Sequence, residues 1–135
     1  MSAYRQSLTL LALPEQTPSA NASTIDKASL LGFPISNCTI DDAARVLVEP
    51  AVKRAPTTVA FLNAHGVTLA ERDPSYGRIL SQADYLVADG VGLRIAARLA
   101  GVTLAGHGNG TDLYPVLCRQ AAQRGLRLFL VGGMP

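Results

Sequence analysis

The sequence predicts an α/β fold from two observations. Apolar runs of strand length alternate along the chain with stretches of helical periodicity, and the runs end on polar or glycine residues. Such alternation favours parallel strands, because each helix returns the chain to the starting edge of the sheet. We therefore expect a Rossmann-like, mostly parallel sheet with helices on both faces, incomplete at the C-terminus. Ligands of such sheets bind beyond the carboxyl ends of the strands.

The chain opens with a segment for which we predict no regular structure. Residues 1–28 are rich in Ser, Thr, Ala, Pro and Gln without a sustained period, which is typical of a disordered leader. Residues 29–135 are expected to form the N-terminal part of one α/β domain. Order should begin at Leu30, where Leu-Leu-Gly-Phe-Pro-Ile indicates a short strand and a turn. Thr39 should then cap a helix that Pro50 ends or kinks.

Two buried strands are expected next, and each ends on a polar residue. Residues 57–62 are β-branched and apolar, the pattern of a strand covered on both faces, and Asn63 follows them. Residues 85–88 form the second run, and Asp89 follows it. The intervening stretch is helical with a break at Asp73-Pro74, where the aspartate caps a second helical piece.

The remaining elements are two helices and a strand. Residues 91–100 are helical, and Gly101 is suited to their C-cap. A glycine-rich loop, residues 106–110, leads to Thr111, which we expect to cap a helix that runs through Arg124. A further strand is predicted over residues 126–131. The chain ends just after it, so we expect a C-terminally truncated sequence.

Composition excludes several classes of protein. A net charge of +2, with scattered arginines, gives no indication of nucleic-acid binding. No run approaches the about 18 apolar residues of a membrane span. The two cysteines, Cys38 and Cys118, lie among apolar residues and outside any CxxC spacing, so we expect buried reduced thiols and no metal site. A cytoplasmic location is the default.

Asp89 is the first candidate for chemistry. A carboxylate at the end of an apolar strand is partly desolvated, so its pKa can be tuned for proton transfer. Gly90 and Gly92 allow a substrate close to the backbone, and the following helix N-terminus favours an anion nearby. The structural alternative is that Asp89 only caps that helix. Asn63 has the same two interpretations: a cap, or an amide that holds a sugar or base.

The other polar candidates are equally open from position alone. His65 is suited to a surface position at a helix start, and His107 lies in a glycine loop where it can contact phosphate or solvent. Thr111 and Asp112 fit a cap with a dipole-favoured acid before they fit a ligand contact. Arg94 and Arg98, one turn apart, would neutralise a diphosphate if they faced the strand ends, but surface arginines are usually solvated.

Several short segments occur in an order that narrows these alternatives. They are Phe61-Leu-Asn-Ala-His65, Ser81-Gln-Ala-Asp84, Val87-Ala-Asp-Gly-Val-Gly92, Asn109-Gly-Thr-Asp-Leu113 and Leu128-Phe-Leu-Val-Gly-Gly133. The succession resembles the WecG/TagA/CpsF family of glycosyltransferases (glycosyltransferase family 26), from about Leu30 to Pro135. Two departures are Phe61, where some members carry threonine, and His107, where some carry arginine.

The resemblance implies an inverting glycosyltransferase of bacterial cell-surface polysaccharides, such as teichoic acid, common antigen or exopolysaccharide. Such an enzyme moves a hexose or N-acetylhexosamine, for example N-acetylmannosamine, from a UDP-sugar to a polyprenyl-diphosphate-linked acceptor, without a cofactor. It lies at the inner face of the cytoplasmic membrane through a C-terminal part missing here. Whether it forms a homo-oligomer is left open. Asp89 is implied as the catalytic base. The implied or suspected substrate contacts are Asn63, His65, Gly90, Gly92, His107, Gly110, Thr111, Asp112, Gly132 and Gly133.

Two other functions remain as alternatives. A nucleotide-dependent oxidoreductase on a Rossmann-like sheet would need a complete glycine fingerprint after its first strand and an acid about 20 residues onward, and neither is present. A non-catalytic α/β fragment is the other.

Overall fold

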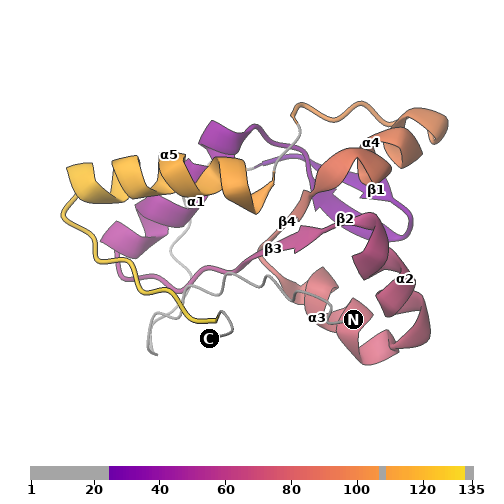
Figure 1. Cartoon of the computed structure of the whole chain (residues 1–135), viewed down its shortest axis with the longest axis horizontal. Coiled ribbons are helices and arrows are strands. Elements are labelled where there is room, and N and C mark those ends of the chain that lie inside the picture. Colours follow the sequence, from indigo (N-terminus) through magenta and orange to yellow (C-terminus); the bar gives the residue numbers. More distant parts are fainter. Residues whose placement is uncertain (1–24, 107–108, 133–135) are drawn as a thin grey trace.

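A computed structural model describes residues 25–106 and 109–132 of the chain. The fold is α/β, as predicted (Figure 1). Its strands are β1 (Lys27–Leu30), β2 (Phe33–Ser36), β3 (Val59–Leu62) and β4 (Tyr85–Ala88). Its helices are α1 (Ile40–Val52), α2 (Ala64–Arg72), α3 (Pro74–Gln82), α4 (Gly90–Leu99) and α5 (Gly110–Gln123).

Strands β3 and β4 form the parallel pair at the centre of the molecule. Their register is fixed where they begin: the Asp84 carboxylate accepts hydrogen bonds from both the amide and the hydroxyl of Thr58, each at 2.8 Å. Leu62 is thereby paired with Ala88 at the other end. Both strands therefore finish at the same level, which brings the residues that follow them to one edge.

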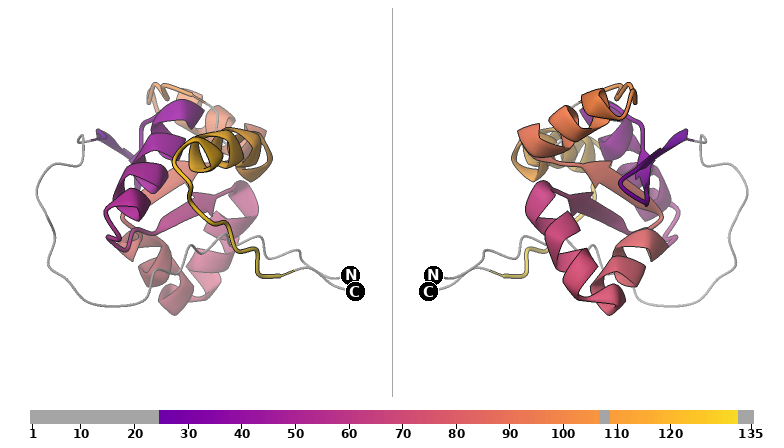
Figure 2. Two further views of the ribbon diagram at one scale, coloured as in Figure 1. Left: turned by 90° about the vertical axis from the view of Figure 1, so that its left-hand side faces the viewer. Right: turned by 90° about the vertical axis from the view of Figure 1, so that its right-hand side faces the viewer.

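Each face of the parallel pair packs against its own apolar cluster. Val59 and Val87 belong to a cluster with α1 and α5, whereas Leu62 and Leu86 belong to one with α3, α4 and the β1–β2 hairpin. This alternation follows from the two-residue period of a strand. Figure 2 shows α1 and α5 on one side of the strands and α2 and α3 on the opposite side. Helices on both faces were predicted, and the structure confirms them.

The β1–β2 hairpin is antiparallel and covers the outer edge of β4. Its two-residue turn, Leu31-Gly32, has positive φ at both positions, 51° and 79°, as a tight right-twisted hairpin requires. Ser36 is buried, and its hydroxyl accepts a hydrogen bond from the amide of Leu86 at 3.1 Å. The side chain thus satisfies a β4 amide that points away from β3.

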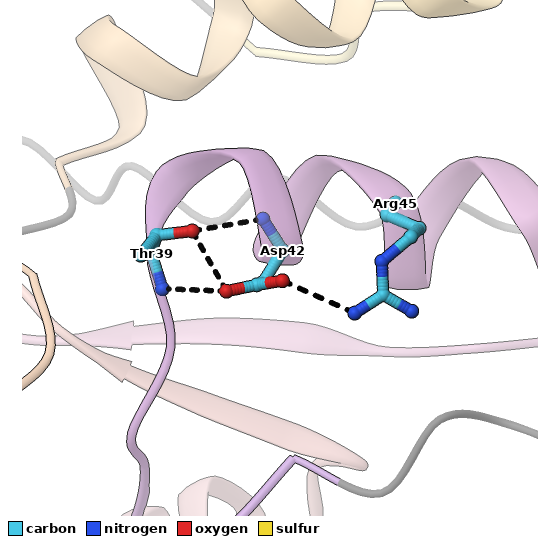
Figure 3. A network of polar contacts seen from close by, with 3 residues as sticks. All are labelled: Thr39, Asp42 and Arg45. Carbon is cyan, nitrogen blue, oxygen red and sulfur yellow. Dashed lines mark hydrogen bonds and ion pairs between the residues drawn. The ribbon is translucent and has the colours of Figure 1, made fainter.

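Helix α1 begins with a reciprocal cap at Thr39, as predicted (Figure 3). The Thr39 hydroxyl accepts a hydrogen bond from the amide of Asp42 at 3.2 Å, and the Asp42 carboxylate accepts one from the amide of Thr39, also at 3.2 Å. Arg45 donates to the same carboxylate at 3.1 Å. Hydrogen bonds from Thr39 and then Arg45 lower the pKa of Asp42. Pro50 lies inside the last turn, and the helix continues to Val52.

The start of α3, before β4, and the end of α4, after β4, lie where the sequence predicts. Asp73 caps α3 by accepting from the amide of Ser75 at 2.9 Å, with Pro74 in the first turn. Gly101 follows α4 with a φ of +69°, which glycine adopts without strain. Along the described part of the chain, no helix is both long and apolar enough to cross a membrane.

Two expectations about element bounds are wrong. The first strand begins at Lys27 rather than at Leu30, because it pairs in full with β2. Residues 126–131 do not form the predicted strand: the parallel sheet of the described residues contains only β3 and β4. Backbone pairing defines a strand, and these residues lack it. Leu126 and Leu128 still pack, partly buried, against the cluster of α1 and α5, whereas Phe129, Leu130 and Val131 are exposed, Phe129 at 83%.

Candidate functional site

The carboxyl ends of β3 and β4 bring Asn63 and Asp89 together. Leu62 and Ala88 are paired in register, and the amide of Asp89 donates a hydrogen bond to the carbonyl oxygen of Leu62 at 2.7 Å. Helix α2 starts one residue after Asn63, and α4 starts one residue after Asp89. Both residues therefore lie at one edge of the sheet, beyond the carboxyl ends of the strands, and two helices begin there. We call this edge the rim.

Asp89 occupies the N-cap position of α4 without acting as a side-chain cap. Its carboxylate makes no hydrogen bond to the amides of the helix. The side chain is half-buried, and this burial raises its pKa above the ordinary value for aspartate. The capping interpretation of Asp89 is thus wrong, and its carboxylate is a stronger base than that of an exposed aspartate.

The two glycines after Asp89 differ in their surroundings. Gly90 has a φ of +84°, and a Cβ placed there would meet no atom within 4 Å, so the backbone beside Asp89 is open. A Cβ on Gly92 would lie 2.9 Å from the Cβ of Ala64, which is closer than real side chains approach. Gly92 therefore allows α4 to pack against the start of α2; a substrate contact there stays a prediction.

Asn63 does act as a cap. Its side-chain oxygen accepts a hydrogen bond from the amide of Gly66 at 2.8 Å, which leaves the amide nitrogen as the part of the side chain that can serve a ligand. His65 lies exposed in the first turn of α2, two residues after Asn63. Both residues are thus at the rim, and their roles toward a substrate stay predictions.

The start of α5 differs from the expectation. Asn109, rather than Thr111, is the N-cap: its side-chain oxygen accepts from the amide of Asp112 at 2.7 Å, and its side-chain nitrogen donates to the Asp112 carboxylate at 2.8 Å. Asn109 suits the cap because Asp112 lies three residues further on, where the carboxamide can accept from its amide and donate to its carboxylate. The residue three positions after Thr111 is Tyr114, which offers no carboxylate. The pattern of an asparagine three residues before an aspartate was the signal for this cap.

The sequence between residues 28 and 135 carries a recognisable family pattern. This segment, which includes the rim and covers well over half of the chain, matches the glycosyl transferase WecG/TagA/CpsF family. The chain belongs to this family. Membership indicates a glycosyltransferase that acts in the synthesis of cell-surface polysaccharides.

The other positions expected to serve this glycosyltransferase are only partly described. Gly110, Thr111 and Asp112 open α5, which runs in the direction opposite to β3 and begins near the middle of the molecule (Figure 1). Gly132 follows no strand, because residues 126–131 are unpaired, so its expected place on the rim has no support in the sheet. His107 and Gly133 lie outside the described residues.

Arg94 and Arg98 of the glycosyltransferase lie on the exposed side of α4. They line a groove of about 480 Å³ between this helix and the loop of residues 102–106. The loop is fixed by Asn37, whose side chain donates to the carbonyl of Thr103 at 3.1 Å and accepts from the amide of Ala105 at 2.6 Å. The arginines therefore flank a groove whose lining does not include Asp89.

The cysteines and the acidic residues form no metal centre in residues 25–106 and 109–132. Cys38 is a buried free thiol, as predicted, and burial together with the nearby Asp42 raises its pKa to about 11. Cys118 is also free and only half-buried.

The chemistry that the rim offers is that of a partly desolvated carboxylate beside open backbone and two helix N-termini.

Proposed function

We propose that this glycosyltransferase inverts the anomeric centre of a UDP-linked hexose or N-acetylhexosamine, such as N-acetylmannosamine, with Asp89 as the catalytic base. The observation that carries the proposal is the Asp89 carboxylate itself. It ends a buried strand, does not cap α4, and has a raised pKa because of burial. A carboxylate held in this way accepts a proton more readily than an exposed aspartate does.

The proposed reaction is a single displacement. Asp89 takes the proton of the acceptor hydroxyl while the hydroxyl oxygen forms a bond to the anomeric carbon. The bond between that carbon and the diphosphate oxygen breaks, and UDP leaves with the bonding electrons. Attack from the face opposite the leaving group inverts the configuration. The acceptor is a polyprenyl-diphosphate-linked sugar, which sets the enzyme at the inner face of the cytoplasmic membrane.

The rim offers two features to the leaving diphosphate. The N-termini of α2 and α4 lie at the ends of neighbouring strands, and helix N-termini stabilise anions through their amides and dipoles. The amide nitrogen of Asn63 is the donor proposed to contact the UDP-sugar. His65, Gly90 and Gly110–Asp112 complete the proposed substrate contacts, with His107, Gly132 and Gly133.

Ligand-induced stabilisation tests the donor class. A ligand that binds the folded state raises the melting temperature by mass action. We expect UDP and UDP-N-acetylmannosamine to raise the melting temperature of the chain, and NAD to leave it unchanged. A rise with NAD alone would favour the oxidoreductase, and no rise with any of them would favour a non-catalytic fragment.

The substitution Asp89→Asn tests the base. Loss of the proton acceptor should lower kcat by about 10²–10⁴-fold, with UDP binding retained. In the wild type, activity should rise with pH as Asp89 loses its proton, and that acid limb should lie above the ordinary aspartate pKa. Burial disfavours the charged form of Asp89, so protonation of this residue stabilises the fold. This contribution is lost as the pH rises through the raised pKa. Asp89→Asn should therefore unfold no more readily than wild type at neutral pH.

Asp41→Asn is the matched control, because Asp41 is an exposed carboxylate in the first turn of α1. It should leave kcat unchanged. Near-normal turnover in Asp89→Asn would refute the assignment of the base.

A further inference from the structure

Helix α4 carries an apolar stripe that the described part of the chain leaves uncovered. Val91, Ile95 and Leu99 follow one another at intervals of four residues, which places them on one side of the helix. Their exposed fractions are 68%, 54% and 85%. Leu93 and Ala97 are buried on the core side, so the helix has apolar residues on two sides.

The same surface carries only positive charge. Arg94 and Arg98 are exposed and alternate with the stripe residues along α4. Residues 90–106, which include the loop beside the helix, contain no aspartate or glutamate. We call Val91, Arg94, Ile95, Arg98 and Leu99 the α4 surface.

We propose that the α4 surface docks on the face of an anionic phospholipid bilayer. Exposed apolar side chains beside cationic ones are the composition of helices that lie in a membrane interface, where the former enter the acyl boundary and the latter contact phosphate groups. Long arginine side chains keep their charge at the head groups while their stems follow the apolar surface. The helix lies along the bilayer plane and does not cross it.

A second copy of the chain fits this surface less well. A symmetric dimer built on the stripe would bring Arg94 and Arg98 of both copies together, and residues 90–106 supply no acid to pair with them. Like charges across an interface oppose association. An anionic bilayer complements both the stripe and the arginines.

Docking in this orientation has a consequence for the rim. Helix α4 begins one residue after Asp89, so the bilayer face would lie beside the open backbone at Gly90. This consequence rests on the proposed function, in which the acceptor is a lipid-linked diphosphate. The docking itself does not depend on catalysis.

Co-sedimentation with vesicles tests the proposal on the whole 135-residue chain. The probes are vesicles of phosphatidylglycerol and phosphatidylcholine in equal parts, and vesicles of phosphatidylcholine alone. We expect binding to the first, weaker binding to the second, and loss of the difference at high salt, because salt screens the contribution of the arginines.

Two pairs of variants separate the apolar from the charged contribution. Ile95→Ser with Leu99→Ser should lower the vesicle partition coefficient at least about tenfold, whereas Ile79→Ser, which alters an equally exposed residue of α3, should not change it. Arg94→Gln with Arg98→Gln should lower binding to the anionic vesicles about fivefold per arginine. Arg72→Gln with Arg119→Gln removes the same charge from other exposed positions and serves as the control.

Three results would overturn the docking: wild-type chain that binds neither vesicle, α4 variants that bind like wild type, or a dimer in sedimentation velocity that Ile95→Ser with Leu99→Ser dissociates. All variants are checked for wild-type melting temperature and for the response to UDP. Vesicle binding that fails while the UDP response persists refutes the docking alone. Vesicle binding that persists while Asp89→Asn retains turnover refutes the base alone.

Discussion

Asn63 and Asp89 occupy equivalent positions after neighbouring strands, yet their side chains do different work. The Asn63 oxygen is held by the amide of Gly66, whereas the Asp89 carboxylate makes no cap to α4. The difference follows from Gly90, whose positive φ turns the first residue of α4 out of the conformation in which a preceding side chain can reach the helix amides. At the residue scale, one position supports a helix and the other remains available for proton transfer.

The substitution Asn63→Asp separates the cap of α2 from a contact with the UDP-sugar. A carboxylate can still accept from the amide of Gly66, so the free energy of unfolding should stay within about 0.5 kcal/mol of wild type, while Asn63→Ala should lose about 1 kcal/mol. Both variants lack the amide nitrogen, so both should bind UDP more weakly. Urea unfolding and UDP titration measure the two effects. Wild-type affinity in Asn63→Asp would leave Asn63 with the capping role alone.

Sequence patterns predict which residues meet at the rim, but not how each side chain is used. Apolar runs and their polar ends predict that Asn63 and Asp89 lie at one edge, because parallel strand direction follows from the alternation of elements. The register that sets them side by side depends on the hydrogen bonds between Thr58 and Asp84. Whether such a residue caps the next helix depends on one backbone dihedral angle and one side-chain rotamer. The same limit explains Thr111: a threonine and an asparagine two residues apart both suit an N-cap, and the hydrogen bonds between Asn109 and Asp112 decide for Asn109.

Contacts between helices set the geometry of the rim at the element scale. The starts of α2 and α4 approach so closely that the Cβ of Ala64 leaves no room for a side chain at Gly92. The two helix N-termini are therefore held at a fixed separation. Because the proposed diphosphate contacts depend on both N-termini, a change in this packing should reach the substrate.

Gly92→Ala should destabilise the protein in spite of the higher helix propensity of alanine. The clash with Ala64 should exceed the propensity gain of about 1 kcal/mol, for a net loss of about 1 kcal/mol or more, with weaker binding of UDP. Adding Ala64→Gly should restore stability by returning the space. Gly110→Ala, where nothing lies within 4 Å, serves as the control and should cost little. Urea unfolding decides: a fully stable Gly92→Ala would contradict the close approach.

The one element that sequence patterns predict wrongly is the strand over residues 126–131. Its mostly apolar composition, with Phe129 and Val131, suits a buried strand. Composition describes one segment, however, and a strand requires a partner. The structure leaves these residues beside no partner strand. The five helices, by contrast, satisfy their hydrogen bonds internally, and the sequence places all of them within one or two residues of their observed bounds.

At the scale of the whole molecule, few polar contacts connect the hairpin with the parallel pair. The hydrogen bond from the amide of Leu86 to the hydroxyl of Ser36 is buried and joins residues far apart in the sequence. Apolar packing of Leu30 and Ile35 against the same side of β4 surrounds it. The hairpin is therefore part of the domain core and not an appendage.

Ser36→Ala should weaken the whole domain. The variant leaves the amide of Leu86 buried without an acceptor, which should cost about 1–3 kcal/mol of the free energy of unfolding. Ser81→Ala alters an exposed serine of α3 and should change that free energy by less than about 0.5 kcal/mol. Equal stability of the two variants in urea would show that water replaces the hydroxyl.

The position of the hairpin also decides in which direction the sheet can grow. Ser36 occupies the outer side of β4 at Leu86, so a further parallel strand, from this chain or from another, has room only next to β3. Growth on that side would turn β3 into an interior strand and keep β4 at the margin. Asn63 would then lie toward the middle of a widened binding edge, and Asp89 would stay at the end of the strand that the hairpin borders.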